Sequence, residues 1–221
     1  MKKNILTIAI AICISSLAFS QTAPNTSNKA KTILDNVSAK TKSYSTIKIG
    51  FTFVHQTKEA GSKAEKANGT LLLKGNKYQL SLLGNTLYCD GANVWTHMVE
   101  DKEVTIASLN GQKDDVFNPA KMLTMYETGF KYKFIQERFE QNIAIYIIDL
   151  FPKEVDKSQY SKIRLYINKD KSQIWKIEYF AKDQNNYTII VNTFEPNLPV
   201  NEIEFKFDKT KFPGVQITDE R

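Results

Sequence analysis

Alternation of apolar and polar residues with a period of two dominates the chain from Ile47 onwards. Turn residues such as Asp90-Gly91 and Asn110-Gly111 punctuate the alternating segments. Strands that follow one another across short turns form an antiparallel meander, and a sheet of this length must curl. The pattern predicts twelve strands, at residues 47–56, 69–73, 77–83, 86–89, 93–99, 103–109, 131–138, 143–149, 163–168, 173–181, 186–194 and 202–207.

Helical spacing is found in two short segments. The first begins at Asn28, with Ser27 or Asn28 as its cap, and repeats apolar residues three and four positions apart at Ala30, Ile33, Leu34 and Val37. In the second, Asn118 is a cap and Pro119 suits the first helical position. Its apolar residues crowd one side at Met122, Leu123, Met125 and Tyr126. We therefore predict one domain, mainly β, in which two short helices accompany a single sheet.

The amino terminus is typical of a secretory signal. Lys2 and Lys3 precede an apolar run, and Ala18-Phe19-Ser20 places small residues before a cleavage point at Gln21. This predicts a signal peptide at 1–20, a disordered leader at 21–28 and a domain at 29–221. Cys13 lies inside the signal and no cysteine follows the cleavage point directly, so we expect a soluble periplasmic protein without a lipid anchor.

Charge and cysteine content narrow the function classes. The net charge of +6 includes Lys2 and Lys3, whose removal leaves +4 on the mature chain. The lysines form no basic run, which together with export disfavours nucleic acid as a partner. Cys89 is the only thiol left after cleavage, so no internal disulfide can form. A secreted domain without disulfides needs a substantial apolar core, and about two hundred residues suffice for one.

Cys89, Asp90 and His97 are the residues that most resemble a reactive centre. Asp90-Gly91 is a strong hairpin signal. An even loop pairs Cys89 with Val94 and puts His97 on the other face of the sheet; an odd loop leaves the thiol and imidazole two rungs apart. Neither arrangement gives a nucleophile and its base, and His97 has no companion at metal-ligand spacing. We therefore expect no enzyme, no metal and no cofactor, with Cys89 as an apolar filler.

Apolar surface is what the sequence offers instead. Segments such as Tyr78–Leu83 and Ile143–Ile148 carry apolar residues on one or both faces. A sheet curled around the helices could enclose an apolar cavity, or the helices could plug the sheet and complete an ordinary core. The residue pattern alone leaves both arrangements open.

Four stretches in order resemble the periplasmic outer-membrane lipoprotein carrier family, the LolA proteins. They are "GTLLLKGNKYQL", "YCDGANVWTHMVEDKEVTIA", "FNPAKML" and "FPGVQITDER", and the resemblance spans about 28–221. The resemblance implies an unclosed antiparallel β-barrel, with short helices forming a lid over an apolar concave face. It also implies a carrier that holds the acyl chains of lipoproteins and moves them from the inner to the outer membrane.

The resemblance implies a monomer with three kinds of partner: acylated lipoproteins, an inner-membrane lipoprotein-releasing transporter as donor, and an outer-membrane acceptor. A periplasmic carrier or sensor for another amphiphilic lipid is the alternative. Family members often place an arginine before the aromatic lining residue to tie the barrel to the lid, and Lys74 stands there. The predicted lining and lid residues are Ile33, Val37, Phe51, Phe53, Tyr78, Leu80, Leu82, Trp95, Met122, Leu123, Met125 and Tyr126, with Lys74 as lid latch.

Overall fold

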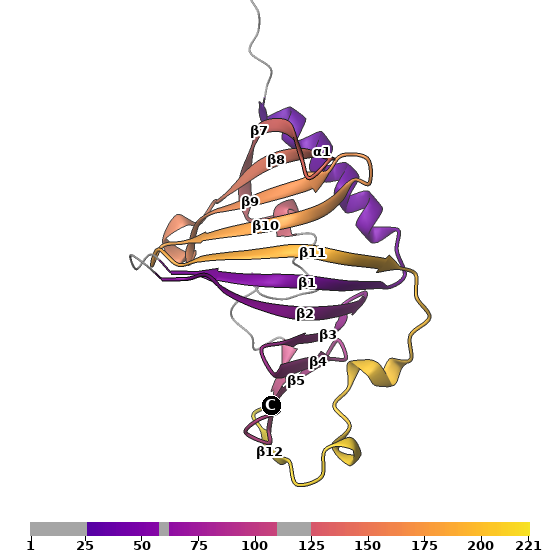
Figure 1. Ribbon diagram of the computed structural model, residues 1–221. Coiled ribbons are helices and arrows are strands. Elements are labelled where there is room, and N and C mark those ends of the chain that lie inside the picture. Colours follow the sequence, from indigo (N-terminus) through magenta and orange to yellow (C-terminus); the bar gives the residue numbers. More distant parts are fainter. Residues whose placement is uncertain (1–25, 58–61, 110–124) are drawn as a thin grey trace, which may run out of the picture.

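A single curved sheet forms the body of the molecule (Figure 1). The computed structural model describes residues 26–57, 62–109 and 125–221. Within them, twelve strands are hydrogen-bonded in the order β12-β6-β5-β4-β3-β2-β1-β11-β10-β9-β8-β7. Strands β12 and β7 end this order without pairing to each other, so the sheet is an unclosed barrel. The prediction of a mainly β fold with a single unclosed antiparallel barrel is confirmed, except that β12 pairs with β6 in parallel.

Two meanders meet at β1 (Ile47–Gln56), which pairs with β2 on one side and β11 on the other. The first meander continues through β2 (Glu65–Lys74), β3 (Lys77–Leu82), β4 (Asn85–Cys89), β5 (Asn93–Met98) and β6 (Glu103–Ser108). The second comprises β7 (Phe130–Glu140), β8 (Ile143–Pro152), β9 (Tyr160–Asn168), β10 (Gln173–Ala181) and β11 (Asn186–Pro196). Eleven of the twelve predicted strands are therefore confirmed, with ends that shift by a few residues.

Helix α1 (Thr26–Lys42) lies along the strands of the second meander (Figure 1). Its buried stripe comprises Ala30, Ile33, Leu34 and Val37, whose apolar spacing predicted the helix, together with Ser38. Lys40 and Lys42 in the last turn suit the negative end of the helix dipole. The helix begins at Thr26, so residues 26–28 belong to it and the leader predicted to reach residue 28 is too long. The predicted signal and the rest of the leader lie outside the described residues.

We call the sheet face that packs on α1 the inner face, and the other the outer face. Antiparallel pairing aligns Ile47, Leu73, Tyr78, Cys89 and Val94 in one row across five strands of the inner face. All five are buried, and they belong to the same apolar core as the α1 stripe. The inner face of the first meander is thus continuous with the core beneath the helix.

The last part of the chain, residues 197–221, forms what we call the C-terminal arm (Figure 1, yellow). It contains two 3-10 turns, η5 (Glu202–Phe205) and η6 (Lys209–Lys211), and ends in β12 (Gln216–Asp219), which pairs with β6 in parallel. The strand predicted at 202–207 is wrong. Apolar residues do alternate there, but Asn201 and Glu204 form a capping box that favours a helical turn. The Asn201 side chain accepts a hydrogen bond from the backbone N–H of Ile203, and the Glu204 side chain accepts one from the backbone N–H of Asn201.

Only the end of the second predicted helix lies in the described part of the chain. Residues 110–124 lie outside the described part of the chain, and the described remainder is the 3-10 turn η3 (Met125–Glu127). A further 3-10 turn, η4 (Val155–Lys157), joins β8 to β9. The Ser38 hydroxyl donates to Glu127 Oε1, and Lys42 Nζ lies 2.7 Å from the same carboxylate. These contacts tie η3 to α1 and, with Lys42 as the largest cause, lower the pKa of Glu127.

Gly69 allows an aromatic ring to lie across the inner face of β2. It pairs with Phe51 of β1, and a Cβ atom at Gly69 would lie 2.3 Å from Cζ of the Phe51 ring. Phe51 is 5% exposed, so the ring has little room to move. We expect Gly69→Val to lower the free energy of unfolding by about 1–3 kcal/mol, as overpacking does. Denaturant unfolding would measure the free energy of unfolding, with Thr70→Val at an exposed outer-face position as the control. Equal losses of stability in the two variants would contradict the role of Gly69.

Candidate functional site

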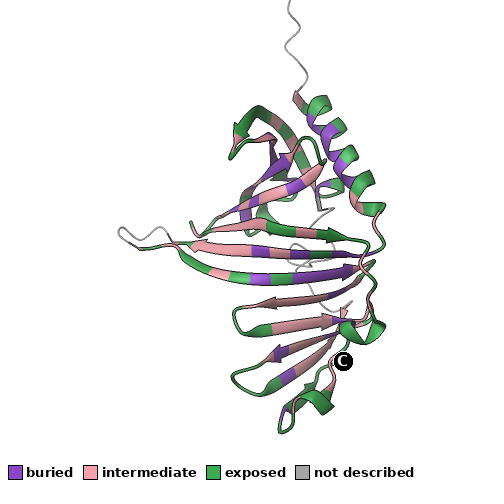
Figure 2. Ribbon diagram, turned by 45° about the vertical axis from the view of Figure 1, so that its right-hand side comes forward, coloured by how far each residue is buried: buried purple, intermediate pink, exposed green. Residues whose placement is uncertain are grey.

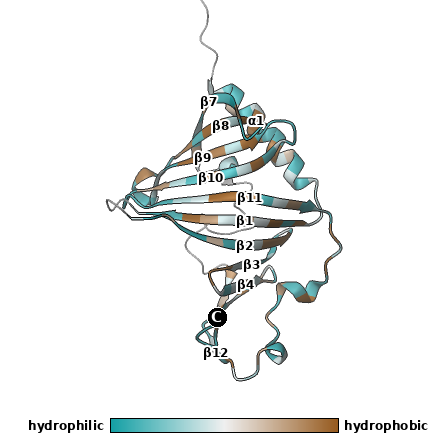
Figure 3. Ribbon diagram, viewed as in Figure 1, coloured by the Kyte–Doolittle hydropathy of each residue, from teal (hydrophilic) through white to brown (hydrophobic). Residues whose placement is uncertain are grey.

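Residues of intermediate burial are frequent along the strands of the first meander (Figure 2), which Figure 3 colours by hydropathy. On the inner face of this meander, several apolar side chains are only half-buried. From β1 to β4, its inner positions are apolar with the exception of His55, Glu65 and Asn85. Burial is complete in the row that contains Tyr78 and Cys89, and it decreases along the strands away from that row. The half-buried members are Phe53, Leu80, Leu82 and Leu87, which pack on the core without being enclosed by it. We call these four residues the open apolar row.

Most of the predicted lining residues in the described chain lie on this face or against it. Phe51 and Tyr78 are buried in the inner core, while Phe53, Leu80 and Leu82 belong to the open apolar row. On the helix side, Ile33, Val37 and Tyr126 are buried. Met122, Leu123 and the side chain of Met125 lie outside the described part. Sequence reasoning missed Leu87, Ile189 and Val191; the pairing of Leu80 with Leu87 across the β3–β4 hairpin could have identified the first of these.

Trp95 was predicted to line the cavity, and this is wrong. Tyr78 pairs with Cys89, and Cys89 pairs with Val94, so these three share the inner face. Trp95 pairs with Tyr88, and both point to the outer face because neighbouring residues of a strand alternate. Trp95 therefore contributes to the outer face of the first meander and does not face Tyr78 or Leu80.

Lys74, the predicted lid latch, pairs with the C-terminal arm in the part of the chain that is described. Its Nζ lies 2.5 Å from Glu202 Oε1, and Lys77 Nζ lies 2.5 Å from Glu202 Oε2. The two lysines, Lys74 first, lower the pKa of Glu202 to about 2. Because Leu73 points inward, Lys74 points outward, where the C-terminal arm crosses the sheet. The lysine pair therefore fastens the arm to the β2–β3 hairpin.

Cys89 and His97 lie on opposite faces of the sheet, as the even loop requires. Asp90 Oδ1 accepts hydrogen bonds from the backbone N–H groups of Ala92 (3.0 Å) and Asn93 (2.9 Å), which makes it the turn residue. Cys89 is fully buried, and burial raises the pKa of its thiol. An inert, buried thiol and a distant imidazole form no nucleophile–base pair.

Cys89→Ser is expected to cost up to about 1–3 kcal/mol of stability and to leave ligand binding unchanged. The cost should fall at the lower end because the hydroxyl can donate to the Asn76 carbonyl, which lies 3.7 Å from Sγ. Thermal melts and acyl-probe titrations would measure both effects. A Cys89→Ser protein that folds but no longer binds the acyl probe would indicate instead that the thiol takes part in function.

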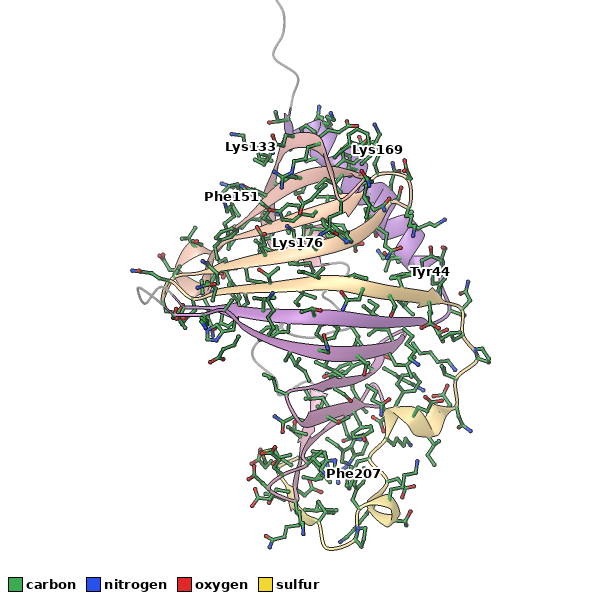
Figure 4. All side chains as sticks on the ribbon, in the orientation of Figure 1. Tyr44, Lys133, Phe151, Lys169, Lys176 and Phe207 are labelled. Carbon is green, nitrogen blue, oxygen red and sulfur yellow. The ribbon has the colours of Figure 1, made fainter. Side chains whose placement is uncertain are left out.

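His97 belongs to an aromatic cluster that holds the C-terminal arm to the outer face. Its ring centroid lies 4.4 Å from that of Phe212 and 5.1 Å from that of Phe207, which is labelled in Figure 4. His97 is 2% exposed, and its Nδ1 has no hydrogen-bond partner among the described residues. Burial lowers the pKa of His97, because the charged imidazole is poorly solvated there.

Acidification is therefore expected to loosen the arm. Because the pKa of His97 is lowered in the folded protein, the unfolded chain takes up the His97 proton at a higher pH than the folded protein does. The contribution of the neutral, packed His97 ring to stability is therefore fully present above about pH 6.5 and decreases as the pH falls below that value. Between about pH 7.5 and 5.5, on either side of that value, the melting temperature of the wild type should fall more than that of His97→Phe, which keeps the aromatic packing without the titration. Parallel curves for the two proteins would contradict this assignment.

Two kinds of feature are absent from residues 26–57, 62–109 and 125–221. No group of three histidine, cysteine, aspartate or glutamate side chains is placed to hold a metal ion in that part of the chain. No helix there is long and apolar enough to span a membrane.

Comparison with known proteins relates the chain chiefly by its fold. A family model described as an uncharacterized protein matches residues 105–194, fewer than half of the chain. No curated protein matches the sequence. An uncharacterized conserved protein from Thermus thermophilus superposes with a TM-score of 0.59 at 11% identity, over 87% of this chain and 99% of that one.

Two further solved structures are more distant. A LolA superfamily protein from Nitrosomonas europaea matches with a TM-score of 0.44 at 11% identity, over 81% of this chain and 98% of that one. LprF from Mycobacterium bovis matches with a TM-score of 0.46 at 12% identity, over 79% and 96%. The chain thus shares its fold with the Thermus protein, and the predicted architecture of an unclosed sheet with a helix on its inner face is the one observed.

Proposed function

We propose that this protein is a periplasmic carrier that binds the acyl chains of lipoproteins on its inner face and transfers them from the inner to the outer membrane. The single observation that carries the proposal is the open apolar row, Phe53, Leu80, Leu82 and Leu87, on the inner face of an unclosed sheet. The four ordered sequence stretches that resemble LolA proteins support the lipoprotein as cargo. The signal-like amino terminus supports the periplasm.

The energetics of the cargo fit such a surface. Each methylene group removed from water contributes about 0.8 kcal/mol, so an acyl chain released into the periplasm is costly unless a protein covers it. A carrier must also give the chain up again. Half-buried side chains next to a closed core can bind a chain without enclosing it completely, which suits reversible transfer.

We also propose that the protein acts by binding rather than by catalysis. The separation of Cys89 and His97 onto opposite faces supports this view, since they were the residues of the sequence most suggestive of a reactive centre. The donor would be an inner-membrane lipoprotein-releasing transporter and the recipient an outer-membrane acceptor. The carrier would act as a monomer.

Mass spectrometry of material that co-purifies with the full-length protein from its native envelope tests the cargo. The proposal predicts acylated lipoproteins, recognised after proteolysis as lipid-bearing amino-terminal peptides. A different amphiphile, such as a glycolipid, would support the alternative carrier or sensor for another lipid on the same face. Recovery of the folded protein with no lipid of any kind would contradict both functions.

A further inference from the structure

A pocket of about 380 Å³ lies between α1 and the ends of β8 and β9. Its rim is polar and is formed by Lys29, Thr32 and Asn36 of the helix together with Lys169 and Ser172 of the β9–β10 turn. Figure 4 labels Lys169 beside α1. The pocket therefore has cationic and hydrogen-bonding groups contributed by two separate elements.

The floor of the same pocket is apolar. It consists of Ile33, Val37 and Ile167, which are at most 9% exposed and belong to the main core, with the ring of Tyr146 beside them. A pocket with an apolar floor and a cationic rim matches an amphiphile whose polar group stays at the rim.

The two lysines of the rim differ in how their charge is balanced. Lys29 Nζ lies 3.8 Å from the ring centroid of Phe134, and no carboxylate of the described chain lies within 4.0 Å of it. Lys169 Nζ lies 5.4 Å from the ring centroid of Tyr146 and forms an ion pair with Glu137. Among the described residues, and counting Glu137, the rim carries one uncompensated positive charge.

We propose that this pocket binds the phosphodiester headgroup of an anionic amphiphile. A phosphodiester carries one negative charge, which equals the uncompensated charge of the rim, and lysine ammonium groups are frequent phosphate ligands. Ser172 offers a hydroxyl donor to a remaining phosphate oxygen, whereas the Thr32 hydroxyl already donates to the Asn28 carbonyl. This inference rests on the proposed lipid-carrier function and adds the chemical class of the ligand.

Calorimetric titration of the full-length mature protein tests the proposal with three soluble ligands. Dihexanoyl phosphatidylglycerol carries both chains and a phosphodiester, dihexanoylglycerol carries the chains alone, and inorganic phosphate carries the anion alone. We expect the phosphatidylglycerol to bind about tenfold more tightly than the diacylglycerol, and inorganic phosphate to bind more weakly than the phosphatidylglycerol.

Single charge removals locate the effect. Lys29→Gln and Lys169→Gln should each weaken phosphatidylglycerol binding by about three- to tenfold while leaving diacylglycerol binding unchanged. Lys40→Gln, on α1, and Lys171→Gln, in the β9–β10 turn, remove the same charge from the same elements outside the pocket and should change neither. All four lysines are exposed, and thermal melts would check that each variant remains folded.

The outcomes separate this proposal from the carrier function. Equal binding of the phosphatidylglycerol and the diacylglycerol would overturn the headgroup site and leave the apolar face intact. If Lys29→Gln and Lys169→Gln both keep the preference for the phosphatidylglycerol, the headgroup does not bind in this pocket. Inorganic phosphate binding as tightly as the phosphatidylglycerol would overturn the amphiphile in favour of a free anion. If the phosphatidylglycerol binds but the diacylglycerol does not bind at all, the acyl chains by themselves contribute no measurable binding, and this would count against the carrier function instead.

Discussion

Leu80→Glu is expected to weaken acyl-probe binding about tenfold or more while the protein remains folded. Leu80 lies in the middle of the open apolar row, so a carboxylate there would have to be desolvated against an acyl chain. In the unliganded protein the half-buried position lets the charge reach water. The measurement is a titration with a fluorescent fatty-acyl probe, paired with a thermal melt.

The neighbouring residue provides the control for this prediction. Gln79 is also half-buried in β3, but it points to the outer face and pairs with Tyr88. Gln79→Glu therefore adds the same charge one residue away on the opposite side of the sheet. Equal loss of probe binding in the two variants would contradict the assignment of binding to the inner face.

Arg164→Met is expected to have the largest effect on stability, about 3–5 kcal/mol. Arg164 donates two hydrogen bonds to Asp149, from Nε at 2.6 Å and from Nη2 at 2.9 Å, and Asp149 is only 4% exposed. Removal of the guanidinium leaves this buried carboxylate with Lys162 Nζ, 3.4 Å away, as its remaining cation. Denaturant unfolding at neutral pH would measure the loss.

A second arginine allows the effect of burial to be isolated. Arg138 Nη2 lies 2.6 Å from Glu140 Oε2 at an exposed site. Arg138→Met should therefore lower the free energy of unfolding by at most about 1 kcal/mol. The double substitution Arg164→Met with Asp149→Leu should recover part of the loss, since no unpaired charge remains buried. Equal costs for the two single arginine substitutions would mean that the buried pair contributes no more than a surface pair.

Local patterns predicted most of the strands well. Asp90-Gly91 specified a turn but left an even and an odd loop open, and the observed pairing of Cys89 with Val94 is that of the even loop. The same reasoning failed for residues 202–207, because the capping box of Asn201 and Glu204 outweighs three alternating apolar residues. Alternation is decisive only where a neighbouring strand can pair with it.

The site was predicted less completely because two of its features depend on distant contacts. The face of Trp95 follows only when the β3–β4 and β4–β5 registers are combined, through Tyr78, Cys89 and Val94. The partner of Lys74 is 128 residues away in a segment that the alternation pattern assigned to a strand. No local sequence signal indicates such an ion pair.

Photocrosslinking with a diazirine-bearing fatty acid tests the binding face most directly. The labelled protein would be digested, and mass spectrometry would identify the modified residues. We predict that labels concentrate at the open apolar row, Phe53, Leu80, Leu82 and Leu87, and are displaced by an acylated lipopeptide. Labels confined to outer-face residues such as Trp95 and Trp175, or labelling that the lipopeptide does not reduce, would contradict a carrier that holds acyl chains on its inner face.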